Sequence, residues 1–328
     1  GAGSFLNSGV ISATAAAGNA IGDDSYVYAG DAYGVYFDDE SGNFTNSGSI
    51  SAAISTGDAT GASSEVAAEY AYGAYIYYGA GSFTNSGSIA ASTVAGSAAG
   101  DSSRSYAYYV YGVYSDDDIG SFINSGNIIV GASAGDASGY GSYAEAYDVY
   151  GVYAYYGAGS FDNSGTISAS ASTGNATGDS STVYADYVYA AYFDDEVGTF
   201  KNSGIVSAGA VAGNAEGDNS GAYAYEAYGS YFYYSPYNFT NSGTITAAAA
   251  VGNAAGGSSY AEAYDVYGLY FDYGDYGVGT FDNSGTITAR ASAGDAAGAD
   301  SDAQAYDVYG VYSYYGAGSF NNSGTISA

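Results

Sequence analysis

Carboxylate side chains occur in triplets that return every 78 residues along the chain. The triplets are Asp38, Asp39 and Glu40; Asp116, Asp117 and Asp118; and Asp194, Asp195 and Glu196. Ca²⁺ takes about six to eight oxygen ligands from carboxylates and carbonyls, so these residues are candidate weak calcium sites. Because the chain has neither an EF-hand loop nor a Gly-Gly-x-Gly-x-Asp repeat, solvated loop charge is the competing interpretation.

Paired carboxylates can also hydrolyse glycosidic bonds. An active site is normally a single departure from a repeated scaffold, however, whereas the acidic triplets recur in every second repeat. The chain contains no Cys and no His, which excludes zinc sites, haem attachment and the usual nucleophile and base pairs. The sequence therefore predicts a protein that is not an enzyme, with no catalytic residues and no cofactor beyond Ca²⁺ or other cations.

Tyrosine is the second chemically active residue type, with 43 copies. The word Tyr-Gly-Val-Tyr begins at Tyr33, Tyr111, Tyr150 and Tyr309, and variants of it begin at Tyr72, Tyr189, Tyr228 and Tyr267. Tyrosine pairs also alternate with the acidic triplets, at Tyr77 and Tyr78, Tyr155 and Tyr156, and Tyr233 and Tyr234. An aromatic ring with a polar tip suits both carbohydrate faces and ordinary sheet surfaces. Electron transport is disfavoured, since no His or Cys could hold a metal that exchanges electrons.

The charge of the chain is one-sided. Its net charge is -31, because 34 Asp and Glu residues face only Arg104, Lys201 and Arg290. Nucleic acid and anionic membrane surfaces require a basic footprint, so neither is an expected partner. No apolar run approaches the ~18 residues of a membrane-spanning helix, so no membrane insertion is expected for this segment. Cations and cationic surfaces are the favoured ionic partners.

A lattice of repeats must position these side chains. The word Phe-x-Asn-Ser-Gly occurs nine times, with a step of 39 residues everywhere except a step of 42 before Phe281. A period of this length indicates stacked units that share one core. Asn and Gly tolerate left-handed backbone, so we expect a sharp corner where Phe points inward and Asn side chains bond along the stack. The predicted structural corners are Asn7, Asn46, Asn85, Asn124, Asn163, Asn202, Asn241, Asn283 and Asn322.

Alternation of polar and apolar residues predicts strands within one repeat. Residues 166–172 alternate strictly, which indicates a strand with Ile167, Ala169 and Ala171 on one face. Residues 173–181 are rich in turn formers, and the tyrosine-rich stretch from Val183 to Phe193 predicts a second long strand. The fold class is therefore all-β, a parallel β-solenoid of about eight repeats of 39 residues.

The alternation of acids and tyrosines favours one coil per repeat over two. Equivalent residues of neighbouring coils would lie about 4.7 Å apart, and like charges directly opposed in a sheet are destabilising. Alternation doubles that separation to about 9 to 10 Å, which is near the Debye length. Duplication of a 78-residue segment explains the pattern equally well. The three extra residues fall within 271–277, where we expect a loop that bulges outward without shifting the strands.

Residues 1–328 are expected to form a single continuous repeat array. The chain opens on Gly-Ala-Gly-Ser-Phe, a word repeated at 316–320, and it stops within a repeat. Solenoids normally carry atypical polar caps, and neither end shows one. We therefore expect either an excerpt of a longer chain or a filament subunit without caps.

The repeats resemble those of bacterial autotransporter passenger domains and related surface β-helix proteins. The resemblance rests on Phe-x-Asn-Ser-Gly-Thr-Ile-Ser-Ala, the Ala/Ser alternation after it and Tyr-Gly-Val-Tyr, and it covers the whole chain. It implies a right-handed parallel β-helix that is secreted to the bacterial cell surface. The strict 39-residue period and the tyrosine content depart from typical passengers, and no functional residue of the family maps onto the chain.

Two functions follow as expectations. The first is a structural extracellular filament or cell-surface fibre whose main partner is itself, as a homopolymer or fibre bundle that extends end to end. The alternative is an adhesin that binds a glycan or a host surface through its tyrosine-rich, acidic face. An adhesin should break the repeat at one face or tip, and the only break is the insertion at 272–277.

Overall fold

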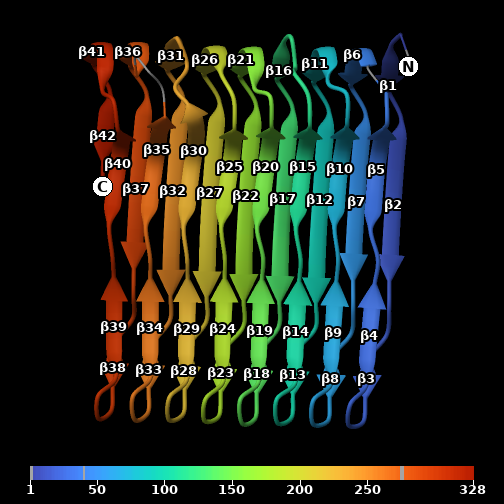
Figure 1. Cartoon of the computed structure of the whole chain (residues 1–328), viewed down its shortest axis with the longest axis vertical. Coiled ribbons are helices and arrows are strands. Elements are labelled where there is room, and N and C mark those ends of the chain that lie inside the picture. Colours follow the sequence, from blue (N-terminus) through green and yellow to red (C-terminus); the bar gives the residue numbers. More distant parts are fainter. Residues whose placement is uncertain (1–2, 40, 274–276) are drawn as a thin grey trace.

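Each repeat forms one coil of an all-β parallel β-solenoid with about eight coils (Figure 1). The computed structural model describes residues 3–39, 41–273 and 277–328. Strands of successive coils pair in parallel with their residues 39 apart, for example Phe83 with Phe122 and Ile128 with Ile167. This register confirms the predicted fold class and the prediction of one coil per repeat. Within the described ranges there is no helix long and apolar enough to cross a membrane.

Five strands make up a coil, as the repeat after Phe122 illustrates. They are β21 (Ala158–Asn163), β22 (Thr166–Thr173), β23 (Ala176–Thr177), β24 (Thr182–Ala185) and β25 (Val188–Phe193). Strand β22 confirms the predicted strand at 166–172. The prediction of one long strand from Val183 to Phe193 is wrong, because strand pairing stops at Asp186 and Tyr187. Ala185 and Asp186 are both buried, so the inward and outward alternation that a continuous strand requires is broken there.

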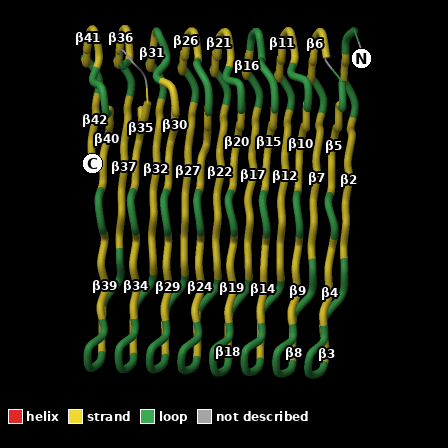
Figure 2. The backbone as a smooth tube through the Cα atoms, viewed as in Figure 1, coloured by secondary structure: helices red, strands yellow, loops and turns green. Residues whose placement is uncertain are grey.

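Equivalent strands of all coils line up into five sheets, in which every fifth strand of the chain is a neighbour (Figure 2). Sheet A runs from β1 (Phe5–Asn7) to β41 (Ala317–Asn322), sheet B from β2 (Val10–Ala16) to β42 (Thr325–Ser327), sheet C from β3 (Ala20–Ile21) to β38 (Ala296–Ala297), sheet D from β4 (Tyr26–Ala29) to β39 (Asp302–Ala305), and sheet E from β5 (Ala32–Phe37) to β40 (Val308–Ser313). The coil is flattened: sheet B forms one layer, and sheets D and E form the opposite one (Figure 1).

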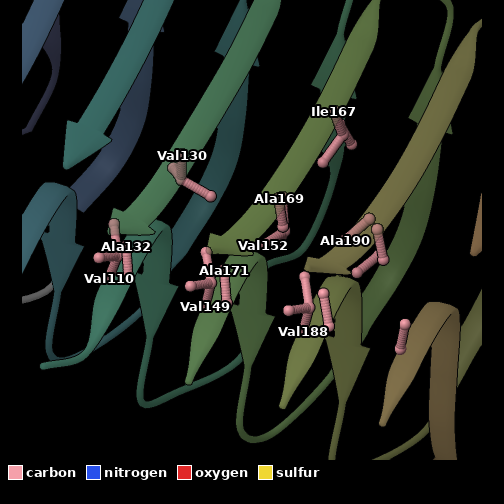
Figure 3. Packing of buried hydrophobic residues seen from close by; sticks show 14 of the residues in the cluster. Val110, Val130, Ala132, Val149, Val152, Ile167, Ala169, Ala171, Val188 and Ala190 are labelled. Carbon is pink, nitrogen blue, oxygen red and sulfur yellow. The ribbon is translucent and has the colours of Figure 1, made fainter. Parts of the chain in front are cut away.

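Small aliphatic side chains fill the space between these two layers. Ile167, Ala169 and Ala171 of β22 point inward as predicted and meet the valines of sheet E (Figure 3). At the edge of the core, the Phe of each repeat stacks on the Phe of the next, with ring centroids 4.9 Å apart for Phe161 and Phe200. The inward position predicted for Phe is therefore confirmed.

The glycine of each Tyr-Gly-Val-Tyr word packs across the core against the isoleucine that follows the Phe-x-Asn-Ser-Gly word of the next coil. A Cβ added to Gly151 of the Tyr-Gly-Val-Tyr word would lie 2.7 Å from Cγ2 of Ile167, sixteen residues later in the next coil. Seven coils combine Gly with Ile at these two positions. In the remaining coil Ala190 replaces the glycine and Val206 replaces the isoleucine, so a methyl group gained on one side is removed on the other. The packing volume of the layer is thereby held constant.

This exchange predicts a coupled pair of substitutions. Gly151→Ala alone is expected to destabilise the fold by about 1–3 kcal/mol through overpacking, and Ile167→Val alone by about 0.5–1.5 kcal/mol. The double variant should lose less than the sum, because it recreates the Ala190 and Val206 arrangement. Urea unfolding of all four proteins measures the coupling, and strict additivity would show that the two positions do not share space.

The corner after Phe-x-Asn is built differently from the expectation. Positive φ angles among the described non-glycine residues do not occur at the corner asparagines, and the corner glycines are not among the positive-φ glycines. Left-handed backbone occurs instead at the sheet C turn, for example at Gly178 and Ser180. The corner needs glycine for another reason: a Cβ on Gly165 would overlap the carbonyl oxygen of Gly126 in the preceding coil.

The corner asparagines form a ladder through the stack. Asn163 Nδ2 donates to Asn202 Oδ1 over 2.8 Å and to the carbonyl oxygen of Ile205 over 3.2 Å. The same amide-to-amide bond links all nine corner positions in sequence. Because an extended amide side chain accepts from one coil and donates to the next, its buried polar atoms are satisfied without a left-handed turn.

The three-residue insertion leaves the flanking strands in register. Strand β35 (Val266–Tyr273) pairs with β30 (Ala227–Tyr234) residue for residue, and β36 (Val278–Asn283) resumes pairing with β31 (Asn238–Asn241) at a step of 42. The prediction that the strands are unshifted is confirmed. Of the range 271–277 that was predicted to bulge outward, residues 271–273 continue β35 in register with β30, and 274–276 lie outside the described residues, so the bulge stays a prediction.

Candidate functional site: two tyrosine columns and an acidic border

The Tyr-Gly-Val-Tyr word places two tyrosines, three residues apart, on the same outer face of sheet E. In β15 (Val110–Ser115) the residues Gly112 and Val113 are both buried, and Gly112 is skipped in the strand register. Two consecutive inward residues shift the alternation by one, so Tyr111 and Tyr114 both point outward. Gly112 therefore has two roles. It leaves space for the isoleucine of sheet B, and it turns the side chains of both tyrosines outward.

The outward tyrosines of eight coils form two parallel columns. Column 1 contains Tyr33, Tyr72, Tyr111, Tyr150, Tyr189, Tyr228, Tyr267 and Tyr309, with neighbouring ring centroids 4.7–5.1 Å apart and planes within 6°. Column 2 contains Tyr36, Tyr75, Tyr114, Tyr153, Tyr192, Tyr231, Tyr270 and Tyr312, with centroids 4.8–5.2 Å apart and planes within 14°. Both columns run the full length of sheet E.

Edge-to-face contacts join the two columns within every coil. The two rings of a coil lie 4.8–5.4 Å apart at angles of 73–90°. This arrangement matches the electrostatic preference of aromatic rings, whose faces are negative and whose edges are positive. Neighbouring rings cover the faces, so the columns present ring edges and hydroxyl groups to the solvent.

Carboxylates border the columns on both sides and accept hydrogen bonds from the phenols. Asp148, two residues before column 1, accepts from the Tyr150 hydroxyl over 3.1 Å, and Asp116, two residues after column 2, accepts from Tyr114 over 3.1 Å. Burial and the adjacent Asp31 raise the pKa of Tyr33 to about 12, and burial and the adjacent Asp272 raise the pKa of Tyr270 to about 12. The phenols are therefore neutral donors over the physiological pH range.

The described residues of the acidic triplets lie in the turns between sheets E and A. Asp39, Asp117 and Asp118 line an open hollow together with Tyr78, which belongs to the coil between them. Asp117 and Asp195 each accept from the next backbone amide, at 2.8 and 2.7 Å. Across the described residues, no group of three or more acidic side chains is arranged to hold a metal ion. Glu40 lies outside the described residues, and calcium binding stays a prediction.

A buried carboxyl cluster was missed by the sequence analysis. Glu145 and Asp186 are both less than 9 % exposed and share a hydrogen bond, and burial together with that bond raises the pKa of Asp186 well above its usual range. Burial raises the pKa of Asp148 to about 6 and that of Glu226 to about 7. An alignment of the repeats could have found the cluster, since Glu145 stands in register between Tyr106 and Tyr184.

These carboxyl groups predict a fold that is more stable in acid. Their folded pKa values lie above the unfolded ones, so their stabilisation is complete below about pH 4 and is lost as pH rises through about 6 to 7. Asp148 alone corresponds to about 3 kcal/mol. Denaturant unfolding at pH 4 and pH 8 measures the loss, and Asp148→Asn should reduce it. A free energy of unfolding that rises from pH 4 to pH 8 would contradict the assignment.

The chain matches no protein-family model, and comparisons with curated proteins and with solved structures find no significant match.

Proposed function

We propose that the protein is a structural element of an extracellular filament or cell-surface fibre, secreted by a bacterium and of the autotransporter passenger type. The observation that supports this most strongly is the uninterrupted register of the side-chain ladders. Phe, Asn and Tyr each stack on their own kind through the coils, from Phe5 to Phe320 in sheet A. In a chain with a single active site, only the coil that carries the site would need a special arrangement of side chains.

Each coil presents the edge that the next coil requires. The strand edges of sheets A to E pair in parallel at every step, so any two coils of this chain are complementary through the same backbone groups. Open strand edges of this kind readily add another chain. Self-association end to end, or extension within a longer array, follows as the mode of fibre growth. The absence of Cys also suits a chain that crosses a membrane before it folds.

A glycan-binding adhesin is the second candidate, and the exposed tyrosine pairs in the turns favour it. Tyr77 and Tyr78 are 37 % and 51 % exposed, and Tyr155 and Tyr156 are 39 % and 50 % exposed. These rings meet edge to face within one pair, at 4.8 Å for Tyr77 and Tyr78, but acidic triplets occupy the same turn of the adjacent coils, so no equivalent tyrosine pair stacks on them from there. Part of each ring surface therefore stays open to a sugar.

Deletion of whole repeats distinguishes a uniform structural element from a chain with one special coil. Removal of residues 161–199 should leave a folded solenoid, shorter by about 4.7 Å, that forms the same fibres. Removal of residues 122–160 should also leave a solenoid, but it brings the triplets at 116–118 and 194–196 onto adjacent coils. We expect this variant to be less stable by about 1 kcal/mol at low salt, and to recover at high salt.

Electron microscopy and thermal unfolding at two salt concentrations give the readouts. Equal fibre formation by both variants supports the structural function. Loss of fibres, or of attachment to a glycan-coated surface, on deletion of only one of these repeats would contradict repeat equivalence and favour the adhesin.

A further inference from the structure

The two tyrosine columns form an unbroken aromatic path along the stack, and we propose that this path carries oxidising equivalents from coil to coil as tyrosyl radicals. The proposal goes beyond the structural function and does not depend on it. Transfer between tyrosines needs no metal within the protein, so the lack of His and Cys does not oppose it. It needs closely packed phenols and hydrogen-bonded proton acceptors at short intervals along them.

Ring packing supplies the first requirement. Tyr150 contacts Tyr111 and Tyr189 in its own column, at 4.9 and 5.0 Å, and Tyr153 in the other column at 5.2 Å. Further contacts cross between the columns of adjacent coils, such as Tyr150 with Tyr192 at 5.8 Å. Each ring therefore has several neighbours, and a single unfavourable tyrosine does not interrupt the path.

Carboxylates supply the second requirement in seven of the eight coils that the described residues form. The phenol and acceptor pairs are Tyr33 with Asp31, Tyr36 with Asp38, Tyr114 with Asp116, Tyr150 with Asp148, Tyr192 with Asp194, Tyr228 with Glu226, Tyr231 with Asp272, Tyr267 with Asp265, Tyr270 with Asp272 and Tyr309 with Asp307. The coil of Tyr72 and Tyr75 is the exception, and it lies between two coils that have acceptors. The acceptors thus follow the columns rather than one coil.

Each transfer moves one electron and one proton together. A one-electron oxidant outside the protein, of the peroxidase-intermediate or photo-oxidised metal-complex class, takes one electron from a tyrosine while the phenolic proton moves to the hydrogen-bonded carboxylate. A neutral radical and a carboxylic acid remain, and the oxidant is reduced by one electron. The radical then accepts an electron from the nearest tyrosine that also donates to a carboxylate and recovers its proton, while that second phenol gives its proton to the carboxylate that it contacts. One oxidising equivalent has moved to the next such tyrosine, which lies one coil away, or two coils away where the coil of Tyr72 and Tyr75 intervenes, and no other bond has changed.

The ring arrangement favours this use of the columns over ligand binding. Carbohydrates and cations bind the faces of aromatic rings. Those faces are occupied by the neighbouring tyrosines of each column, as for Tyr72 between Tyr33 and Tyr111. Tyr228 and Tyr267 are less than 9 % exposed, which also shields a radical from the solvent.

The test places an oxidant at one end of the path and maps radicals at the other. The chain has no Cys, so Tyr314→Cys gives a single attachment site that is 66 % exposed and two residues beyond Tyr312. A ruthenium polypyridyl complex attached there is photo-oxidised in the presence of a sacrificial electron acceptor and a covalent spin trap. Mass spectrometry of peptides then measures trap adducts at Tyr33 and Tyr36, in the coil farthest from the label.

A four-tyrosine variant interrupts the path. Phe keeps the ring stacking but lacks the phenol that is oxidised, so the interrupted chain carries Tyr→Phe at positions 150, 153, 189 and 192. The matched control carries the same number of Tyr→Phe changes in the turn tyrosines 77, 78, 155 and 156, which lie outside the columns. An isotope-labelled chain without the cysteine, in the same solution, reports radicals that arrive by diffusion.

We expect adducts at Tyr33 and Tyr36 in the labelled chain and in the control variant, and their loss in the interrupted chain. Adducts confined to the coils next to the label, or distal adducts that persist in the interrupted chain, would overturn the proposal. If the four-fold variant does not fold by circular dichroism, the variant with Tyr150→Phe and Tyr153→Phe alone gives the same comparison, with a partial loss expected.

Discussion

Asn163→Asp is expected to lower the free energy of unfolding at pH 7 by about 3–5 kcal/mol. Asn163 is fully buried, accepts from Asn124 Nδ2 over 2.8 Å and donates to Asn202 Oδ1 over 2.8 Å. An ionised aspartate can still accept from Asn124, but it cannot donate, so its charge faces the Asn202 oxygen without a proton between them. The ladder then lacks one hydrogen bond at a buried corner.

Acid provides the control for this variant. A protonated aspartic acid has one hydroxyl donor, which can replace the lost bond to Asn202. The deficit relative to the parent chain should therefore shrink toward pH 3 and grow as the pH rises. Urea unfolding of both proteins at pH 3 and pH 7 measures it. A variant as stable as the parent at pH 7 would show that the asparagine ladder contributes little to the fold.

Gly165→Ala is the second substitution with a large expected effect, a loss of at least about 3 kcal/mol. The added methyl group would overlap the carbonyl oxygen of Gly126, which belongs to the rigid corner of the preceding coil. Both coils must separate or bend to admit it, and the Phe and Asn ladders on either side resist this change.

Gly209→Ala is the matched control for the corner glycine. Gly209 lies within β27 (Ile205–Ala212), has an ordinary backbone angle, and an added Cβ meets no described atom within 4 Å. Alanine there should be neutral or slightly stabilising, because it reduces the freedom of the unfolded chain. Thermal unfolding of the two variants side by side gives the comparison. Equal effects at Gly165 and Gly209 would contradict the close approach of the coils.

The features that could be predicted from the sequence are those encoded locally and repeated. The period of 39 residues, the strand with Ile167, Ala169 and Ala171 on one face, and the inward Phe each follow from spacing and alternation alone. The spacing of like charges favoured one coil per repeat, although duplication of a 78-residue segment explained the same alternation equally well.

The features that were missed depend on contacts between coils. The bonds of Asn163 along the stack were predicted and are confirmed, but the left-handed backbone expected of Asn and Gly at the corner is wrong. Gly165 is needed there because the carbonyl oxygen of Gly126 lies too close for a Cβ, and this contact with the preceding coil is not visible within one repeat. The break in the strand at Asp186 was not predicted, because the alternation of inward and outward residues continues up to Ala185.

The tyrosine columns were only partly visible in the sequence. The recurrence of Tyr-Gly-Val-Tyr indicated a tyrosine-rich surface, but strict alternation would place residues three apart on opposite faces of a strand. Gly112 and Val113, both buried, reverse that expectation for Tyr111 and Tyr114. The reason lies across the core, where isoleucines such as Ile128 occupy the space that each glycine leaves.

Cryo-electron microscopy of the native material, measuring the axial rise along each fibre, tests the structural account most directly. One coil per 39 residues, stacked through continuous parallel ladders, predicts fibres with an axial repeat of about 4.7–4.8 Å. It also predicts a weaker repeat at twice that spacing, since acids and tyrosines alternate from coil to coil at positions such as Asp117 and Tyr156. Native material made only of separate compact particles, or fibres without the axial repeat of about 4.7–4.8 Å, would contradict it.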